Sequence, residues 1–335
     1  MGHTQKTYTE FTPLEALAQM MDGDMRETNA VIIDRMESPV ALIPQLATYL
    51  IAAGGKRIRP LLTLATTFMY KGDMKRAQKL AASVEFIHTA TLLHDDVVDE
   101  SAERRGQETA NLIFGNQASV LVGDFLFSRA FELMTECDNI AVLKILSKAS
   151  SVITQGEVLQ LSKAGDINIT MDDYIEIITS KTAALFAAAC EVGPVLSGAS
   201  QDDAKAMHDY GLNMGIAFQI ADDALDYNSD AKTLGKTIGD DFREGKITAP
   251  ILIALKQADE TEKEFWKTIM TAKKRSDQDL DKAQAILLKH NSIQSAYELA
   301  EDYAQKAQEA LTKTPNSPLH PLLHDLVPYT IFRKT

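Results

Sequence analysis

The stretch RAQKLAASVEFIHTATLLHDDVVD (residues 76–99) decides the fold of this chain. Its apolar residues recur at steps of three and four, which is the period of a helix with one buried face. The stretch ends in a D-D-x-x-D motif, in which Asp95 and Asp99 share one face of the helix, a turn apart. That face continues backwards through Thr91 or Leu92 to His88. The sequence therefore predicts a long helix that carries two carboxylates beside apolar side chains.

The same period recurs along most of the chain. It is clear in residues 8–36, 128–161 and 171–193. At one break between such segments, Thr170 precedes Asp172 and Asp173, which predicts a helix that begins there. The sequence has no alternating strand pattern longer than a few residues and no shift in composition that would mark a linker. We therefore expect an all-α helical bundle, with one domain over residues 1–335.

Composition and charge bound the function. The chain has 335 residues, a formal net charge of −13 and two cysteines, Cys137 and Cys190, without metal-ligand spacing. So few cysteines predict a reduced, cytoplasmic location. The N-terminal residues contain no signal-peptide core, and no run of about 18 apolar residues could span a bilayer. The negative charge argues against a nucleic-acid-binding protein. It would also repel a diphosphate, unless metal cations intervene.

A second D-D-x-x-D motif lies far downstream. It contains Asp222, Asp223 and Asp226, with Gln219 one turn earlier. Carboxylates about 6 Å apart repel by roughly 3 kcal/mol at an effective dielectric constant near 20, and apolar surroundings add a desolvation cost. Mg²⁺ removes both costs, and it leaves coordination positions for phosphate oxygens. One D-x-x-x-D is more often a solvated surface, but two copies in apolar helices indicate metal sites.

Basic residues accompany both acidic motifs. GGKRIRP (54–60) supplies Lys56, Arg57 and Arg59 after two glycines that let an anion approach the backbone. The others are Arg104 and Arg105 after the first motif, Lys181 beside Thr182, and Lys236 and Lys246 after the second motif. Any one of them, or His88 alone, is more often a surface charge or a packed side chain. Their joint order indicates a site for diphosphates.

This order of motifs resembles the trans-isoprenyl diphosphate synthases, or polyprenyl synthetase family, over residues 52–250. The resemblance implies the isoprenoid synthase fold, an all-α bundle around a deep central cavity, and a homodimer. It implies Mg²⁺ as cofactor, with three ions once substrate is bound. It also implies a prenyltransferase that condenses isopentenyl diphosphate head-to-tail onto an allylic diphosphate, such as farnesyl diphosphate.

The resemblance also implies a role for each matching residue. Lys56, Arg59, His88 and Arg105 would bind isopentenyl diphosphate. Arg104, Lys181, Thr182, Gln219, Lys236 and Lys246 would contact the allylic diphosphate. Asp95, Asp99, Asp222 and Asp226 would hold the metal ions, with Asp226 acting through water. The residues most directly involved in catalysis would be Asp95, Asp99, Arg104, Lys181 and Asp222.

The helix that carries Asp95 also bears on product length. Ala90 lies about 7.5 Å earlier along this helix, with Thr91 and Ile87 near it. Bulky aromatic residues near these positions close the pocket in short-chain members of the family, whereas Ala90 leaves the passage open. We therefore expect a long all-trans product of about C40–C50 for a quinone side chain. A deeper side chain, on the helix near Leu159, could set the length instead.

Three alternatives stay open from the sequence. A geranylgeranyl or farnesyl diphosphate synthase would share every motif and differ only in the floor of the pocket. A terpene cyclase also uses an aspartate-rich helix and Mg²⁺, but it generally lacks GGKxxRP and the Arg104–Arg105 pair. A non-catalytic synthase subunit would have degraded aspartate motifs, and both motifs are intact here.

Overall fold

The computed structural model describes residues 11–52, 54–104, 106–228 and 238–332. The helices are α1 (Pro13–Met20), α2 (Asp22–Met36), α3 (Leu42–Ala52), α4 (Ile58–Met69), α5 (Met74–Val98), α6 (Ala110–Phe114), α7 (Asn116–Glu136), α8 (Ile140–Lys163), α9 (Met171–Ile178), the π-helix η1 (Thr179–Ala183), α10 (Ala184–Leu196), α11 (Gln201–Asp226), α12 (Asp240–Glu244), α13 (Ala249–Gln257), α14 (Glu260–Met270), α15 (Asp277–Lys289), α16 (Ser292–Leu311) and α17 (His320–Ile331). Strands β1 (Glu103–Arg104) and β2 (Gln107–Glu108) form a short antiparallel hairpin. The predicted all-α class is confirmed.

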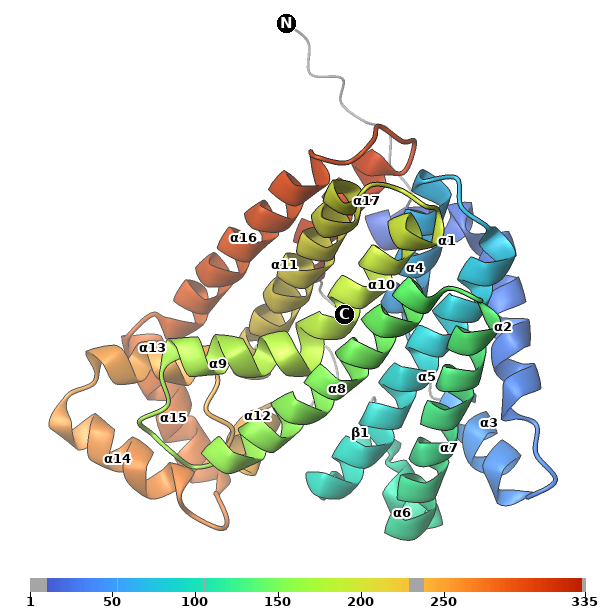
Figure 1. Ribbon diagram of the computed structural model, residues 1–335. Helices are drawn as coiled ribbons and strands as arrows, with labels where there is room; N and C mark the ends of the chain where they lie inside the picture. Colours follow the sequence, from blue (N-terminus) through green and yellow to red (C-terminus); the bar gives the residue numbers. More distant parts are fainter. Residues whose placement is uncertain (1–10, 53, 105, 229–237, 333–335) are drawn as a thin grey trace, which may run out of the picture.

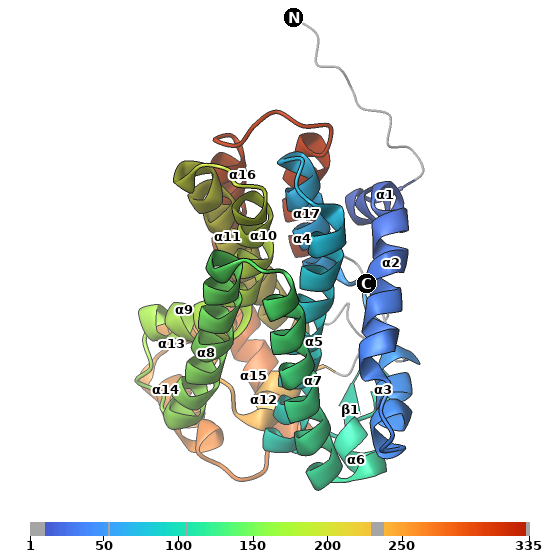
Figure 2. The ribbon, with the colours of Figure 1, turned by 45° about the vertical axis from the view of Figure 1, so that its right-hand side comes forward.

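The long helices pack side by side (Figures 1 and 2). α5 lies against α4 and α7, α10 lies against α4, α8 and α11, and α16 packs along α11. Two hydrophobic clusters form the core. The first cluster joins α1, α4, α10, α11 and the C-terminal helices, and the second joins α2, α3, α5, α7, α8 and α10. Within the described residues, no helix has the length and apolar character to cross a bilayer.

Local capping decides where several helices begin. The Thr170 hydroxyl accepts a hydrogen bond from the Asp173 N–H at 3.1 Å, and the Asp173 carboxylate accepts one from the Thr170 N–H at 2.9 Å. This capping box confirms the helix start predicted there. The helical period over 128–161 is interrupted at Asp138, which has a φ of 45°. α8 then begins after Asn139, whose side chain accepts from two backbone N–H groups.

Glycines in α11 allow a close backbone contact with α10 and η1. A Cβ added at Gly211 would lie 2.4 Å from the carbonyl oxygen of Phe186, and one at Gly215 would lie 2.6 Å from Cα of Ala183. Since Gly215 precedes Gln219 by one helical turn, this contact places η1 beside the second aspartate motif. The glycines therefore help to position the candidate site.

Replacing Gly211 by Ala should destabilise the protein, although Ala favours helices. The new methyl group would collide with the backbone of α10, at a cost of about 1–3 kcal/mol. Gly23→Ala in α2 is the matched control, because a Cβ there meets nothing within 4 Å. It should instead raise stability by up to about 1 kcal/mol. Urea denaturation measures both changes, and equal effects of the two substitutions would contradict the packing argument.

Candidate functional site

Both aspartate motifs lie at the C-terminal ends of long helices. Asp95 lies in the last turn of α5 and Asp99 is its C-cap residue, while Asp222 and Asp226 belong to the last turn of α11. A helix C-terminus presents unpaired carbonyl groups and the negative end of the helix dipole. It is therefore an unfavourable place for a carboxylate. Each motif adds negative charge where negative potential already exists, so both need positive partners.

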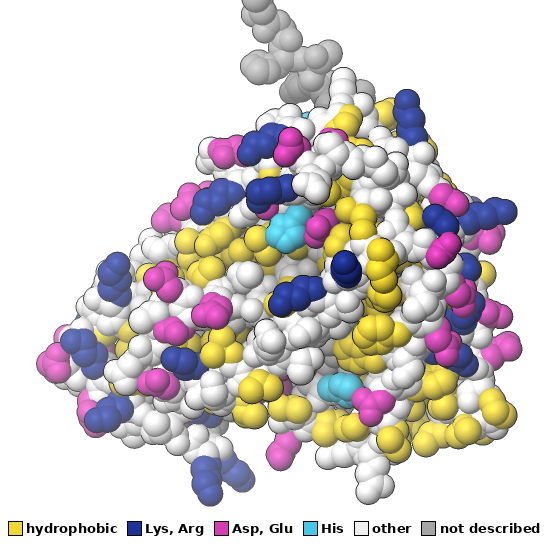
Figure 3. All heavy atoms as spheres, in the orientation of Figure 1, with side chains coloured by type: hydrophobic (Ala, Val, Ile, Leu, Met, Phe, Trp, Pro, Cys, Tyr) yellow, Lys and Arg dark blue, Asp and Glu magenta, His cyan; other side chains and the backbone are white. Residues whose placement is uncertain are grey.

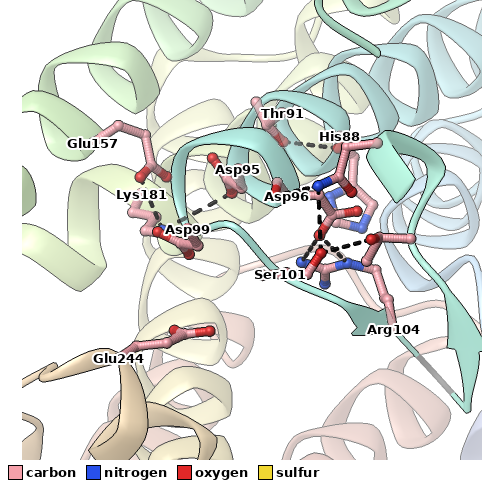
Figure 4. Close-up of polar contacts among 12 residues, drawn as sticks. His88, Thr91, Asp95, Asp96, Asp99, Ser101, Arg104, Glu157, Lys181 and Glu244 are labelled. Carbon is pink, nitrogen blue, oxygen red and sulfur yellow. Dashed lines mark hydrogen bonds and ion pairs between the residues drawn. The ribbon is translucent and has the colours of Figure 1, made fainter. Parts of the chain in front are cut away.

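The first motif faces two lysines. Nζ of Lys246 lies 2.9 Å from Oδ2 of Asp99, and Nζ of Lys181 lies 3.9 Å from Oδ2 of Asp95. Figure 4 shows Asp95 and Asp99 on the side of α5 that faces Lys181. Burial raises the pKa of Asp95 to about 6, against the opposing effect of Lys181, and the carboxylates of Glu157 and Asp99 raise it further. The effect of burial on this carboxylate thus outweighs that of Lys181.

The second motif is partly stabilised by α12. The Asp226 carboxylate accepts hydrogen bonds from the N–H groups of Asp240 at 3.2 Å and Asp241 at 3.1 Å, at the first turn of that helix. Burial nevertheless raises the pKa of Asp226 to about 6; these two N–H groups oppose the shift, while the carboxylates of Asp240 and Asp222 add to it. The pKa of Asp241 is also raised, by burial and by the nearby Asp223 and Asp226.

The second aspartate of each motif has a different set of partners. Asp96 is buried, and its Oδ1 accepts a hydrogen bond from Nε of Arg104 at 2.9 Å and forms an ion pair with Nη2 at 2.8 Å. Asp223 is also buried, and it accepts from the Tyr174 hydroxyl at 2.6 Å and from Nε2 of Gln219 at 2.7 Å. Each of these carboxylates therefore orients a side chain that the sequence predicts to bind substrate.

Sequence reasoning missed the roles of Asp96, Asp223 and Tyr174. The available signal was the doubling of the aspartate, because adjacent helical residues point about 100° apart. Two neighbouring carboxylates on one helix therefore point in different directions, so one of each pair is expected to contact a different partner from the other.

The π-helix η1 connects the two motifs. Lys181 points toward Asp95, and the hydroxyl of the next residue, Thr182, donates to Oε1 of Gln219 at 2.8 Å. Gln219 in turn binds Asp223. Single turns of π-helix are frequent at functional sites, because the extra residue in the turn redirects the neighbouring side chains. Here two consecutive residues reach the two aspartate motifs.

Lys246 makes a second connection. It contacts both Asp99 and Glu244. Burial alone would lower the pKa of Lys246, but the carboxylates of Glu244, Asp241 and Asp99 outweigh burial and raise it. Because the N–H of Asp241 binds Asp226, this lysine links the end of α5 to the end of α11 through α12. The two motifs are therefore connected in two ways, through η1 and through Lys246 with α12.

The basic residues of GGKRIRP point in different directions. The Arg59 guanidinium lies over the ring of Phe186, with Cζ 4.3 Å from the ring centroid. Lys56 lies near an aromatic ring of α17, with Nζ 6.0 Å from its centroid. Arg57 adopts a left-handed backbone conformation before α4 and lies 3.6 Å from Glu85 of α5. Arg57 thus contacts α5, whereas Arg59 contacts α10 and Lys56 lies near α17.

A hollow that opens to solvent lies beside α5. His88, Asp96, Arg57 and Arg104 line it, together with side chains of α2 and α3. His88 and Arg104 therefore lie on the Asp96 side of α5, away from the contacts of Asp95 with Lys181 (Figure 4). The deep central cavity expected from the sequence stays a prediction. Two predicted site residues, Arg105 and Lys236, lie outside the described residues.

Of the residues predicted to set product length, two lie in the hydrophobic core and one is partly exposed. Ala90 and Ile87 are completely buried in the second hydrophobic cluster, among side chains of α7, α8 and α10. Thr91 is partly exposed, and its hydroxyl donates to the backbone oxygen of His88 at 2.7 Å. Phe86 lines the hollow beside α5. Ala90 thus points into an apolar layer behind the acidic site.

A metal ion at this site would need ligands that the protein does not supply. Across the described ranges, no three His, Cys, Asp or Glu side chains converge closely enough to hold a metal ion. Mg²⁺ often binds in this way, through one or two carboxylates plus water and phosphate oxygens. The geometry therefore suits a cation that arrives with an anionic ligand.

Tyr174→Phe should lower the free energy of unfolding by about 1–3 kcal/mol, because buried Asp223 would lose a hydrogen-bond donor. Tyr303→Phe is a matched control, since Tyr303 is a half-buried residue of α16 whose ring lies beside Lys306. It should change stability by less than about 0.5 kcal/mol. Urea denaturation measures both variants. A loss for Tyr174→Phe no greater than that of the control would show that the Tyr174–Asp223 bond is unimportant.

Comparisons with known proteins show sequence and fold similarity to one family. The family model described as polyprenyl synthetase matches residues 40–287. Octaprenyl diphosphate synthase from Escherichia coli (strain K12) is 43% identical over 307 residues, which are 91% of this chain and 94% of that protein. A decaprenyl diphosphate synthase structure from Rhodobacter capsulatus has 48% identity and a TM-score of 0.91, covering 96% of this chain and 100% of that one. A polyprenyl synthase from Caulobacter crescentus CB15, complexed with calcium and isoprenyl diphosphate, has 49% identity and a TM-score of 0.92, covering 96% and 98%. The chain therefore belongs to the polyprenyl synthetase family.

Proposed function

We propose that the protein is a divalent-metal-dependent prenyltransferase. It would condense isopentenyl diphosphate onto an allylic diphosphate, such as farnesyl diphosphate, and release an all-trans polyprenyl diphosphate of about C40–C50 for a quinone side chain. The observation that carries this proposal is the connection of the two aspartate motifs through Lys181, Thr182 and Lys246. The relatives named as octaprenyl and decaprenyl diphosphate synthases support a long product.

The residues present fit a divalent metal. The carboxylates of Asp95, Asp99, Asp222 and Asp226 are hard oxygen donors, and burial raises the pKa of both Asp95 and Asp226. A cation would remove the repulsion that contributes to these shifts. We propose Mg²⁺, with three ions when substrate is bound, and Asp226 acting through water. When bound, the metal would draw negative charge from the allylic diphosphate and weaken its C–O bond.

The basic side chains would form two groups, one for each diphosphate. Arg104, Lys181 and Lys246 would stabilise the charge that develops on the departing allylic diphosphate, which is commonly the largest catalytic contribution. Thr182, Gln219 and Lys236 would complete its contacts. Lys56, Arg59, His88 and Arg105 would hold isopentenyl diphosphate with its double bond toward the allylic carbon. The C–O bond breaks, a C–C bond forms, and a proton passes to the released diphosphate.

We infer a homodimer that forms through α7 and α8. Leu121 of α7 and Leu161 of α8 are each 67% exposed, and Val158 of α8 is 62% exposed. Figure 3 shows hydrophobic side chains gathered on the face that these helices present. Contiguous apolar surface of this kind marks contact sites between proteins.

We also propose that residues 1–335 form one domain that works in the cytoplasm. α5 and α10 contribute side chains to both hydrophobic clusters, which supports a single cooperative core. Cys137 and Cys190 are both buried free thiols, as is usual in a reducing compartment.

Incubation with farnesyl diphosphate, labelled isopentenyl diphosphate and Mg²⁺ tests the function. We expect labelled products of about eight to ten isoprene units, and complete loss of turnover when a chelator removes the metal. Product sizing by chromatography is the measurement. Products of four units or fewer would overturn the proposed chain length, and turnover that survives chelation would overturn the metal requirement. Consumption of the allylic substrate alone would favour a terpene cyclase.

Ala90→Phe should shorten the product and leave the first condensation intact, because the ring would fill the apolar layer behind the acidic site. Thr89→Phe adds a ring to the same helix, but Thr89 lines the hollow on the other side of α5. This control should leave product length unchanged. Chromatography of the products compares both variants with the unmodified protein. If Ala90→Phe makes full-length product, Ala90 does not limit the chain.

A further inference from the structure

We propose that Glu157 of α8 is a positioning residue that keeps Lys181 from neutralising Asp95. In this arrangement Asp95 stays available for a divalent cation, while Lys181 stays charged and ready for the allylic diphosphate. The inference rests on the proposed function, and it gives a role to Glu157, which lies outside both aspartate motifs.

The distances show which partner Lys181 prefers. Its Nζ lies 2.8 Å from Oε2 of Glu157, within hydrogen-bond distance, and 3.9 Å from Oδ2 of Asp95. Figure 4 places Lys181 between the two carboxylates. A charge-assisted hydrogen bond at 2.8 Å is much stronger than an ion pair near 4 Å. Glu157 therefore binds the ammonium group of Lys181 directly, whereas Asp95 forms only a longer ion pair with it.

The backbone fixes this choice of partner. Next to Glu157, Gly156 lets α8 approach η1 so closely that a Cβ at residue 156 would lie 2.8 Å from the backbone nitrogen of Lys181. The same Cβ would lie 2.7 Å from Cβ of Ser180. Glu157 thus projects from a rigid helix directly beside the π-helix that carries its partner. A surface lysine would have no such constraint.

The Glu157 carboxylate also has an unused oxygen. Its Oε1 is buried and has no hydrogen-bond partner among the described residues. A buried carboxylate oxygen without a donor costs free energy, so packing alone does not explain an acid at this position. Substrate binding would bring diphosphate oxygens to Lys181, and Lys181 could then bind the diphosphate while Glu157 continues to hold it.

Removing the charge of Glu157 should therefore transfer Lys181 to Asp95. In Glu157→Gln, the amide keeps the shape of the side chain but attracts an ammonium group less strongly than the Asp95 carboxylate does. A direct Lys181–Asp95 pair would compete with a cation for the same oxygens. We expect the affinity for Mg²⁺ in the presence of inorganic diphosphate to fall by about five- to tenfold.

Isothermal titration calorimetry of the full chain with Mg²⁺ and inorganic diphosphate tests this expectation in a double-mutant cycle. The variants are Glu157→Gln, Lys181→Ala and the two together. Since Glu157 is proposed to act through Lys181, Glu157→Gln should have little further effect once Lys181 is absent. Glu136→Gln is the matched control, because Glu136 also binds a lysine at 2.8 Å, Lys79, but outside the site. Its Mg²⁺ affinity should be unchanged.

A kinetic readout separates positioning from general damage. Glu157→Gln should raise the Mg²⁺ concentration for half-maximal turnover and leave the KM for isopentenyl diphosphate unchanged. Unchanged Mg²⁺ affinity in Glu157→Gln, or an equal loss in the Lys181→Ala background, would overturn the inference. Failure of the proposed function looks different, because the unmodified protein would then not elongate any allylic diphosphate.

Discussion

Repulsion among carboxylates at the ends of α5 and α11 is the constraint on which the rest of the site depends. Four carboxylates lie where two helices already present negative potential, and burial keeps water from screening them. The protein supplies Lys181, Lys246 and the first turn of α12 as positive partners. The pKa of Asp95 and that of Asp226 are still raised to about 6. Additional cations would offset the remaining negative charge, which reconciles a net charge of −13 with the proposed binding of diphosphates.

The two aspartate motifs divide their work in the same way. The first and last carboxylates of each motif are the ones predicted to hold metal ions, and the second is buried against a neighbour. Asp96 holds Arg104, and Asp223 holds Gln219 with help from Tyr174. Helical geometry explains this division, because consecutive side chains diverge by about 100°. Each pair of adjacent aspartates thus supplies one side chain to the proposed metal site and one that orients a neighbouring side chain.

The sequence predicts what depends on local period and capping. The helices and the start of α9 at Thr170 follow from such signals. The π-helix at Lys181 does not follow from local signals. It lies in close contact with α8 at Gly156, and such a contact between separate helices leaves no mark in the local sequence pattern. The Tyr174–Asp223 bond joins residues 49 positions apart, and no periodicity reports such a pair. Roles for individual residues came from resemblance, and they stay predictions.

The pairing of Arg104 with Asp96 limits how that arginine can meet a ligand. Two of its nitrogens, Nε and Nη2, are committed to a carboxylate that is only 4% exposed. Leaving the buried Asp96 carboxylate without its cation would be costly, so the exchange of Asp96 for an incoming anion is unfavourable. The remaining nitrogen, Nη1, is the edge that can be offered without this loss. A guanidinium can thus bind a carboxylate through one edge and an incoming anion through another.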